Sequence, residues 1–136
     1  MLTRRTLLTA LGAIAAIADG AGAQSPAPPR PVFQHDLPNI NLADWSVTAV
    51  EVPYGPGQSS APHRHPGITI AYVLEGSIRS KVGDDPEQTY TAGQMFIEMP
   101  DQLHAVSGNA SSTQPAKLLA ILLTKKGATL TSPATP

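Results

Sequence analysis

The sequence predicts a single all-β domain built as an antiparallel sandwich or barrel, and three observations lead to this fold class. The 136 residues suit one domain, since independent domains usually run to roughly 100–150 residues. Fourteen prolines and eleven glycines disfavour a helical bundle. Short runs rich in β-branched residues are separated by turn residues about every ten positions, which is the spacing of antiparallel sandwiches and barrels.

The composition excludes several classes of function. Nine Lys and Arg residues stand against ten Asp and Glu residues, the formal net charge is −1, and only 14% of residues are charged. Such a chain has no basic surface with which to bind nucleic acid or an anionic membrane. It contains no cysteine, so disulfides, thiolate zinc sites and a cysteine nucleophile are excluded. A small-molecule substrate is the expected partner.

The first 23 residues have the layout of an export signal. Arg4 and Arg5 precede an uncharged, largely apolar stretch over residues 6–18, and small residues lead up to Ala23 as the expected cleavage point. The adjacent arginines resemble a twin-arginine signal, with an ordinary secretory signal as the alternative. The stretch is shorter than the ~20 residues that a spanning helix needs. We therefore expect a periplasmic or secreted protein without a membrane span after signal cleavage.

Two segments at either end of the expected mature chain are predicted to lie outside its core. Residues 24–44 are rich in proline, which favours an extended arm. His35 in this arm is expected to be a free surface histidine, not a ligand. Residues 127–136 consist mainly of Ala, Thr, Pro and Ser, which predicts a flexible C-terminal tail.

Residues 45–126 form the expected domain, and each predicted strand in it ends at a turn signal. The apolar run from Ala116 to Leu123 would suit a short buried helix as well as a core strand, and we predict a strand. The predicted strands are Val47–Val52, Ile68–Leu74, Ile78–Val82, Gln88–Thr91, Met95–Glu98, Ala105–Ser107 and Lys117–Leu123.

Three histidines form the candidate reactive site. His63 and His65 are two positions apart, so in an extended segment their side chains point to the same face. His104 follows a turn that leads into another predicted strand. Imidazole is a common ligand of first-row divalent metals, and three such ligands would leave coordination positions open. An open coordination shell predicts a reactive metal rather than a structural one.

The order of residues around the first two histidines resembles the first motif of the cupin superfamily. That motif runs from a glycine through five residues to His-x-His, then to a glutamate and, after six intervening residues, to a second glycine. Here Gly57 is followed by His63 and His65 and, at the end of the motif, by Gly76. Thr69 stands where the family usually has the glutamate, and this is the informative departure.

The residues around His104 resemble the second cupin motif, with three departures. The motif begins with Gly93 and reaches His104 at the expected interval. Met99 stands where the family has proline, and Asp101 where it has glycine. Asn109 comes one residue later than expected.

The resemblance implies a cupin jelly-roll β-barrel, also called a double-stranded β-helix. The sequence looks most like single-domain cupins of the quercetin dioxygenase-like type and the three-histidine dioxygenases that cleave β-diketones. It thus implies an Fe(II)-dependent dioxygenase of a small enolisable carbonyl or phenolic substrate, and a homodimer. Mn, Ni, Cu or Zn remain alternatives to Fe(II). The alternative function is a non-enzymatic periplasmic module that binds a metal or small ligand. The implied metal ligands are His63, His65 and His104.

Glu98 is the candidate catalytic residue, because it ends a predicted strand six positions before His104. In related three-histidine cupins a glutamate here supports the metal ligands. Three roles are open: a fourth ligand in place of the missing carboxylate, a group that orients a ligand, or a proton acceptor from an acidic C–H bond. The competing interpretation is a solvated residue on the outer face of the strand.

Three further residues are candidates for the substrate pocket. Tyr72 and Phe96 would line it, with apolar neighbours such as Ile70 and Leu119. The alternative for Tyr72 is a packed core aromatic. Arg79 would pair with Glu98 or anchor an anionic substrate. In an alternating strand, Arg79 could equally face solvent.

Overall fold

The computed structural model describes residues 27–134. The predicted export signal at residues 1–23 lies outside these residues. The chain divides into two units, residues 1–30 and residues 31–136. Of the first unit only residues 27–30 are described, and they are exposed and without regular structure. Within residues 27–134, no helix is long and apolar enough to cross a membrane.

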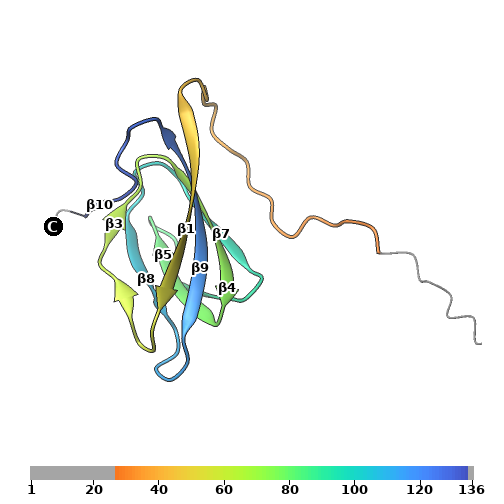
Figure 1. Cartoon of the computed structure of the whole chain (residues 1–136), viewed down its shortest axis with the longest axis vertical. Coiled ribbons are helices and arrows are strands. Elements are labelled where there is room, and N and C mark those ends of the chain that lie inside the picture. The colour runs from red at the N-terminus through yellow and green to blue at the C-terminus, as the bar shows by residue number, and fades with distance from the viewer. Residues whose placement is uncertain (1–26, 135–136) are drawn as a thin grey trace, which may run out of the picture. The chain divides into compact units, whose positions relative to one another are not determined.

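The described part of the second unit contains ten strands and no helix, which confirms the predicted all-β fold (Figure 1). The strands form two antiparallel sheets in a jelly-roll arrangement. One sheet has the order β1-β9-β4-β7, and the other has the order β10-β3-β8-β5-β6, with β2 paired to β8. The strands are β1 Trp45–Tyr54, β2 Ser59–Ser60, β3 His63–Arg64, β4 Ile68–Glu75, β5 Ser77–Val82, β6 Gln88–Thr91, β7 Met95–Glu98, β8 His104–Asn109, β9 Ala116–Lys125 and β10 Ser132–Pro133.

The hydrophobic core lies between the two sheets and follows from the twofold alternation of side chains along each strand. In β9, buried and half-buried residues alternate from Ala116 to Thr124. In β5, Ile78 and Val82 are buried while the residues between them alternate between exposed and buried. These two sets meet in one cluster, which includes Tyr54 and Phe96. Burial of this cluster stabilises the barrel through the hydrophobic effect.

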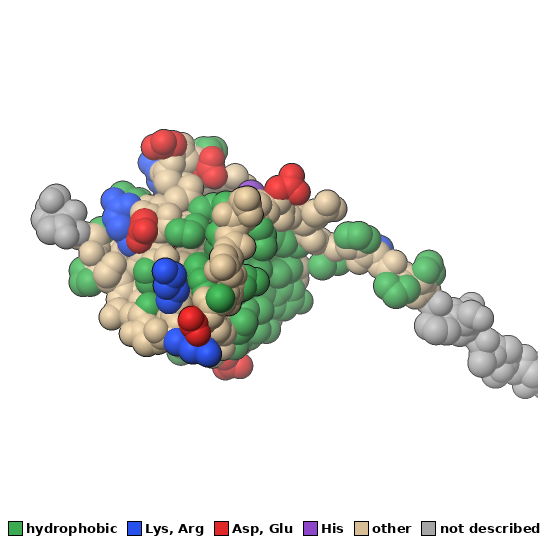
Figure 2. Space-filling model, turned by 90° about the horizontal axis from the view of Figure 1, so that it is seen from above, with side chains coloured by type: hydrophobic (Ala, Val, Ile, Leu, Met, Phe, Trp, Pro, Cys, Tyr) green, Lys and Arg blue, Asp and Glu red, His purple; other side chains and the backbone are tan. Residues whose placement is uncertain are grey.

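The outer face of the four-stranded sheet is also apolar, and this corrects part of the predicted pocket. Ile70, Tyr72 and Leu119 lie at neighbouring register positions on this outer face, whereas Ala71 and Leu118 face inward. Hydrophobic side chains gather over one side of the domain in Figure 2. Because both faces of β4 and β9 are apolar, alternation alone does not show which face is inside. The prediction that Ile70, Tyr72 and Leu119 line the pocket is therefore wrong.

A β-bulge in β8 sets the side chains that face the interior. Val82 pairs with His104, but Lys81 pairs with Val106, so the register shifts by one residue. After the shift, Ser107 points to the same side as His104, although the two residues are three positions apart. Without the bulge, Ser107 would lie on the opposite face of the sheet.

The C-terminal end differs from the predicted flexible tail. Ser132 and Pro133 form β10 and pair with Arg64 and His63 of β3. The sequence of this end carries no strand pattern, because two exposed residues pair through their backbone alone. As a result, the C-terminal segment lies beside the candidate histidines.

Candidate metal centre

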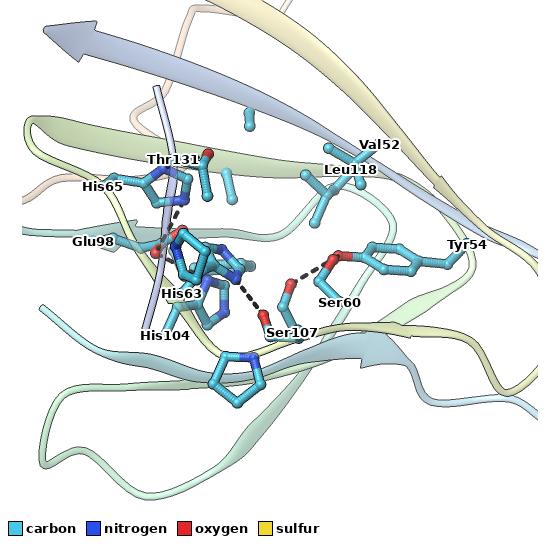
Figure 3. Close-up of a pocket in the computed structure, with 16 residues that line it drawn as sticks. Val52, Tyr54, Ser60, His63, His65, Glu98, His104, Ser107, Leu118 and Thr131 are labelled. Carbon is cyan, nitrogen blue, oxygen red and sulfur yellow. Dashed lines mark hydrogen bonds and ion pairs between the residues drawn. The ribbon is translucent and has the colours of Figure 1, made fainter. Parts of the chain in front are cut away.

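Four side chains converge at one end of the barrel (Figure 3). They are His63 in β3, His65 just after it, Glu98 at the end of β7 and His104 at the start of β8. One ligand atom from each residue lies within 4.8 Å of the other three. The ring of His63 is 4.9 Å, centroid to centroid, from each of the other two imidazoles. The structure thus brings together the four residues that the sequence singled out.

Strand pairing produces this convergence. His63 and His104 are direct cross-strand partners between β3 and β8, so their side chains lie on one face. The chain then turns at Gly67, where a Cβ atom would lie only 1.9 Å from the carbonyl oxygen of Leu123. A glycine at this position therefore lets the segment after His65 pass against β9.

Asp101 holds the loop before His104 and explains one departure from the motif. Its φ is 60°, the left-handed region in which glycine is favoured and Asp is tolerated. Its N–H donates a 2.8 Å hydrogen bond to the carbonyl oxygen of His65. Asp101 thus adopts the backbone conformation suited to the glycine of the motif.

Each imidazole is oriented by a hydrogen bond on the side away from the cluster. Nδ1 of His63 lies 2.8 Å from the carbonyl oxygen of Ala61, and Nδ1 of His65 lies 2.8 Å from that of Leu130. Because a carbonyl only accepts, both Nδ1 atoms carry the proton and both Nε2 atoms face the cluster with a free lone pair.

His104 faces the cluster with its other nitrogen. Its Nε2 lies 2.9 Å from Oγ of Ser80 on β5, and its Nδ1 lies 2.9 Å from Oε2 of Glu98. His104 Nδ1 and Glu98 Oε2 are close but not aligned as a hydrogen bond, so both are buried polar atoms without a hydrogen-bond partner. When Ser80 accepts the Nε2 proton, both atoms carry lone pairs and repel each other unless a cation lies between them.

The local environment favours the metal-binding form of His63. Burial lowers the pKa of this imidazole below its usual range, and the neighbouring His104 and His65 add to the effect, while the bond to Ala61 and the charge of Glu98 oppose it. A lowered pKa keeps the ring neutral, and only a neutral imidazole offers a lone pair to a metal.

The four residues lie in the wall of a cavity of about 430 Å³. Phe96 lines this cavity, as predicted, and its other apolar walls include Val52, Leu118 and Ala120. The hydroxyl groups of Tyr54, Ser60 and Ser107 also line it and were not predicted from the sequence. Ser107 could not have been found by alternation, because the bulge in β8 reverses its direction.

The structure shows where the side chains of Glu98 and Arg79 lie. Glu98 is buried, with 3% of its surface exposed, so it is not a solvated residue on the outer face. Arg79 does not reach it. The Arg79 guanidinium is about half exposed and lies 3.2 Å from the carboxylate of Glu87. The predicted role of Arg79 in the pocket is therefore wrong, because alternation along β5 turns this side chain outward.

Comparison with known families agrees with the fold and the residue pattern. The model of the cupin domain family matches residues 50–122, which is more than half of the chain. The chain belongs to the cupin family. A search of curated proteins found no significant match to this cupin.

Solved structures show the same fold at low sequence identity. A double-stranded β-helix protein from Klebsiella pneumoniae is 23% identical, with a TM-score of 0.54 over 66% of this cupin and 76% of that chain. A cupin-like protein from Thermotoga maritima is 20% identical, with a TM-score of 0.57 over 65% of this cupin and 64% of that chain. A DMSP lyase from Ruegeria pomeroyi is 18% identical, with a TM-score of 0.57 over 65% of this cupin and 43% of that chain.

Proposed function

We propose that this cupin binds one divalent transition metal, Fe(II) in the native protein, and cleaves a small enolisable carbonyl or phenolic substrate with oxygen. His63, His65 and His104 would be metal ligands, and Glu98 would be the fourth. The observation that carries this proposal is the cluster itself: four buried or half-buried donor atoms lie within 4.8 Å of one another at the wall of an apolar cavity.

The donor atoms fit a divalent transition metal. Two of the three imidazoles have their ring proton directed outward, and the buried Glu98 Oε2 and His104 Nδ1 lack a hydrogen-bond partner. A cation between these atoms would relieve the cost of burying them unpaired. Three imidazoles and one carboxylate suit Fe, Mn, Ni, Cu or Zn better than Mg or Ca, which prefer oxygen ligands.

The charge of the ligand set favours an anionic substrate group. Three neutral imidazoles and one carboxylate carry a charge of −1 in total, so a divalent ion would retain a net positive charge. When bound, the metal would act as a Lewis acid on an enolate or phenolate oxygen.

The protein side chains would perform two tasks in this reaction. The apolar walls formed by residues such as Phe96 and Leu118 exclude water from the reacting group. Among the described residues lining the cavity, Glu98 is the only carboxylate, so it is the group that would accept the proton lost on enolisation.

Metal analysis and oxygen uptake test this proposal. Protein purified from its own source would contain about one iron per chain. The native source is needed because overexpression can load a different metal. His65→Ala would lose the metal, whereas His35→Ala, a change outside the cluster, would retain it. The iron-loaded protein would consume oxygen with a β-diketone or a flavonol.

Other outcomes of the same assay separate the competing functions. Substrate loss without oxygen uptake would indicate a lyase, a class represented among the structural neighbours. Saturable binding with no turnover would indicate a metal or ligand-binding module. Failure of the wild-type protein to bind any transition metal would overturn the metal centre.

A further inference from the structure

Three hydroxyl groups form a second polar site in the same cavity. Oη of Tyr54 lies 2.8 Å from Oγ of Ser60 and 2.9 Å from Oγ of Ser107. Tyr54 and Ser107 are 6% and 4% exposed. In Figure 3 the three hydroxyl groups lie on one side of the cavity and the histidines on the other, with Val52 and Leu118 above.

The hydrogen bonds within this set leave donor capacity free. The three hydroxyls carry three protons, and each of the two contacts uses one of them. Among the described residues, these hydroxyls have no other side-chain partner. One O–H donor and several lone pairs therefore remain for a molecule in the cavity. A purely structural set would use its capacity within the protein, because an unmet buried donor is costly.

Local backbone features bring the three hydroxyls together. The bulge in β8 turns Ser107 inward. Gly108, the next residue, pairs with Ser59, and a Cβ at Gly108 would lie 2.5 Å from that of Ser59. A glycine here therefore lets β2 lie close against β8, which places Ser60 beside Tyr54.

The charge of the cavity limits what its far end can hold. Among residues 27–134, no Lys or Arg lines this cavity, and its titratable lining side chains are Tyr54, three histidines and Glu98. A carboxylate or phosphate at the hydroxyl end would be buried without a counter-charge, which is strongly unfavourable. An uncharged hydroxyl or carbonyl group would be satisfied there by the free donor and lone pairs.

We propose that the substrate has one metal-binding oxygen group at one end, an apolar middle and an uncharged hydroxyl or carbonyl at the other end, which Tyr54, Ser60 and Ser107 bind. This inference rests on the proposed metal-dependent function and specifies its substrate class. Tyr54 is a specificity-determining residue in this arrangement. The apolar middle lies along walls such as Val52 and Leu118.

Matched 2-oxo acids test the proposal by binding alone. The probes are 4-hydroxyphenylpyruvate, phenylpyruvate and 2-oxoglutarate, which end in a hydroxyl, a bare ring and a carboxylate. Calorimetry on the Ni(II)-loaded protein measures their affinities. The wild-type protein would bind the hydroxylated probe about five- to tenfold more tightly than phenylpyruvate, the value of roughly one hydrogen bond. It would bind 2-oxoglutarate most weakly.

Tyr54→Phe would abolish the preference for the hydroxylated probe and leave the affinity for phenylpyruvate and for Ni(II) unchanged. Ser107→Ala would reduce the same preference. It serves as the second variant in case Tyr54→Phe proves unstable. Tyr72→Phe is the matched control, because Tyr72 lies on the outer face of β4, and it would keep the wild-type preference.

The outcomes separate this proposal from the metal centre. Nickel binding with no preference in the wild-type protein, or a preference that survives both variants, would overturn the two-ended substrate and leave the metal centre intact. Absence of metal binding by the wild-type protein would overturn both.

Discussion

Thr69 and Glu98 are direct cross-strand partners, one on β4 and the other on β7. Both are buried, and cross-strand partners project to the same face of a sheet. The family pattern has a glutamate at the position of Thr69, and this cupin has its carboxylate on the neighbouring strand instead. The carboxylate therefore occupies the same region of the barrel, although it comes from the second motif region and not from the first.

Exchanging the two residues tests whether Glu98 replaces the missing carboxylate. Glu98→Thr alone would weaken metal affinity by at least about tenfold, because it removes a buried charged group facing the ion. The double change Thr69→Glu, Glu98→Thr would recover most of that affinity. Chelator competition measures both, with the exposed Glu87→Thr as a control that leaves affinity unchanged. A double variant as weak as the single one would show that the carboxylate must come from β7.

The fold was largely predictable because its strands follow local rules. Turn residues separate short β-branched runs, and all seven predicted strands lie within observed strands. The predicted strand Ala105–Ser107 covers only part of β8, which runs from His104 to Asn109. The convergence of the histidines followed from alternation and from the motif spacing.

The features that sequence reasoning missed depend on contacts between distant segments. The inner face of β4 was assigned incorrectly because Ile70 and Ala71 are both apolar. The inward direction of Ser107 depends on a bulge against β5. The carbonyl of Leu130 orients His65 from 65 positions away. None of these three features can be predicted from the residue types of neighbouring positions in the sequence.

The C-terminal segment is predicted to support the metal centre. A chain ending at Thr129 would lose the Leu130 carbonyl that holds His65, and metal affinity would fall by roughly ten- to a hundredfold. The thermal midpoint would also fall, because the truncation removes Leu130, which packs against the core cluster, although β10 itself is exposed. Chelator competition and thermal unfolding provide the two readouts. A chain ending at Ala134 is the control, and equal affinity in both chains would contradict the prediction.

Asp101 is predicted to carry backbone strain that glycine would relieve. Its φ is 60°, and its side chain makes no hydrogen bond or ion pair among the described residues. Asp101→Gly would thus raise the free energy of unfolding by up to about 1 kcal/mol. Asp101→Val would lower it by about 1–2 kcal/mol, because a β-branched residue is disfavoured there. Denaturant unfolding measures both.

Asp44 provides a comparison far from the cluster in sequence, since its φ is 59°. Asp44→Gly would give a similar gain in unfolding free energy. Asp101→Val would also weaken metal binding, because the Asp101 N–H holds the carbonyl of His65. A valine variant with unchanged unfolding free energy would show that the left-handed conformation carries no strain.

Asn109 is predicted to hold the far end of the cavity in place. Its Nδ2 donates hydrogen bonds of 3.0 Å to the carbonyl of Gly55 and 2.7 Å to that of Gln114, and its Oδ1 accepts one of 2.8 Å from the N–H of Ser111. Asn109→Ala would leave these groups unpaired and lower the free energy of unfolding by about 2–4 kcal/mol.

Asn109→Asp keeps the shape of the side chain but removes its two donated hydrogen bonds, so it separates the effect of hydrogen bonding from that of side-chain volume. The carboxylate still accepts from Ser111, but it places a buried negative charge against two carbonyl oxygens, so it would destabilise at least as much as alanine. Asn41→Ala is the control, because the Asn41 hydrogen bond is exposed. Since Gly55 directly follows Tyr54, both Asn109 variants would reduce the preference for a hydroxylated probe while leaving nickel affinity unchanged. Loss of nickel affinity instead would show that Asn109 supports the whole barrel rather than its hydroxyl end.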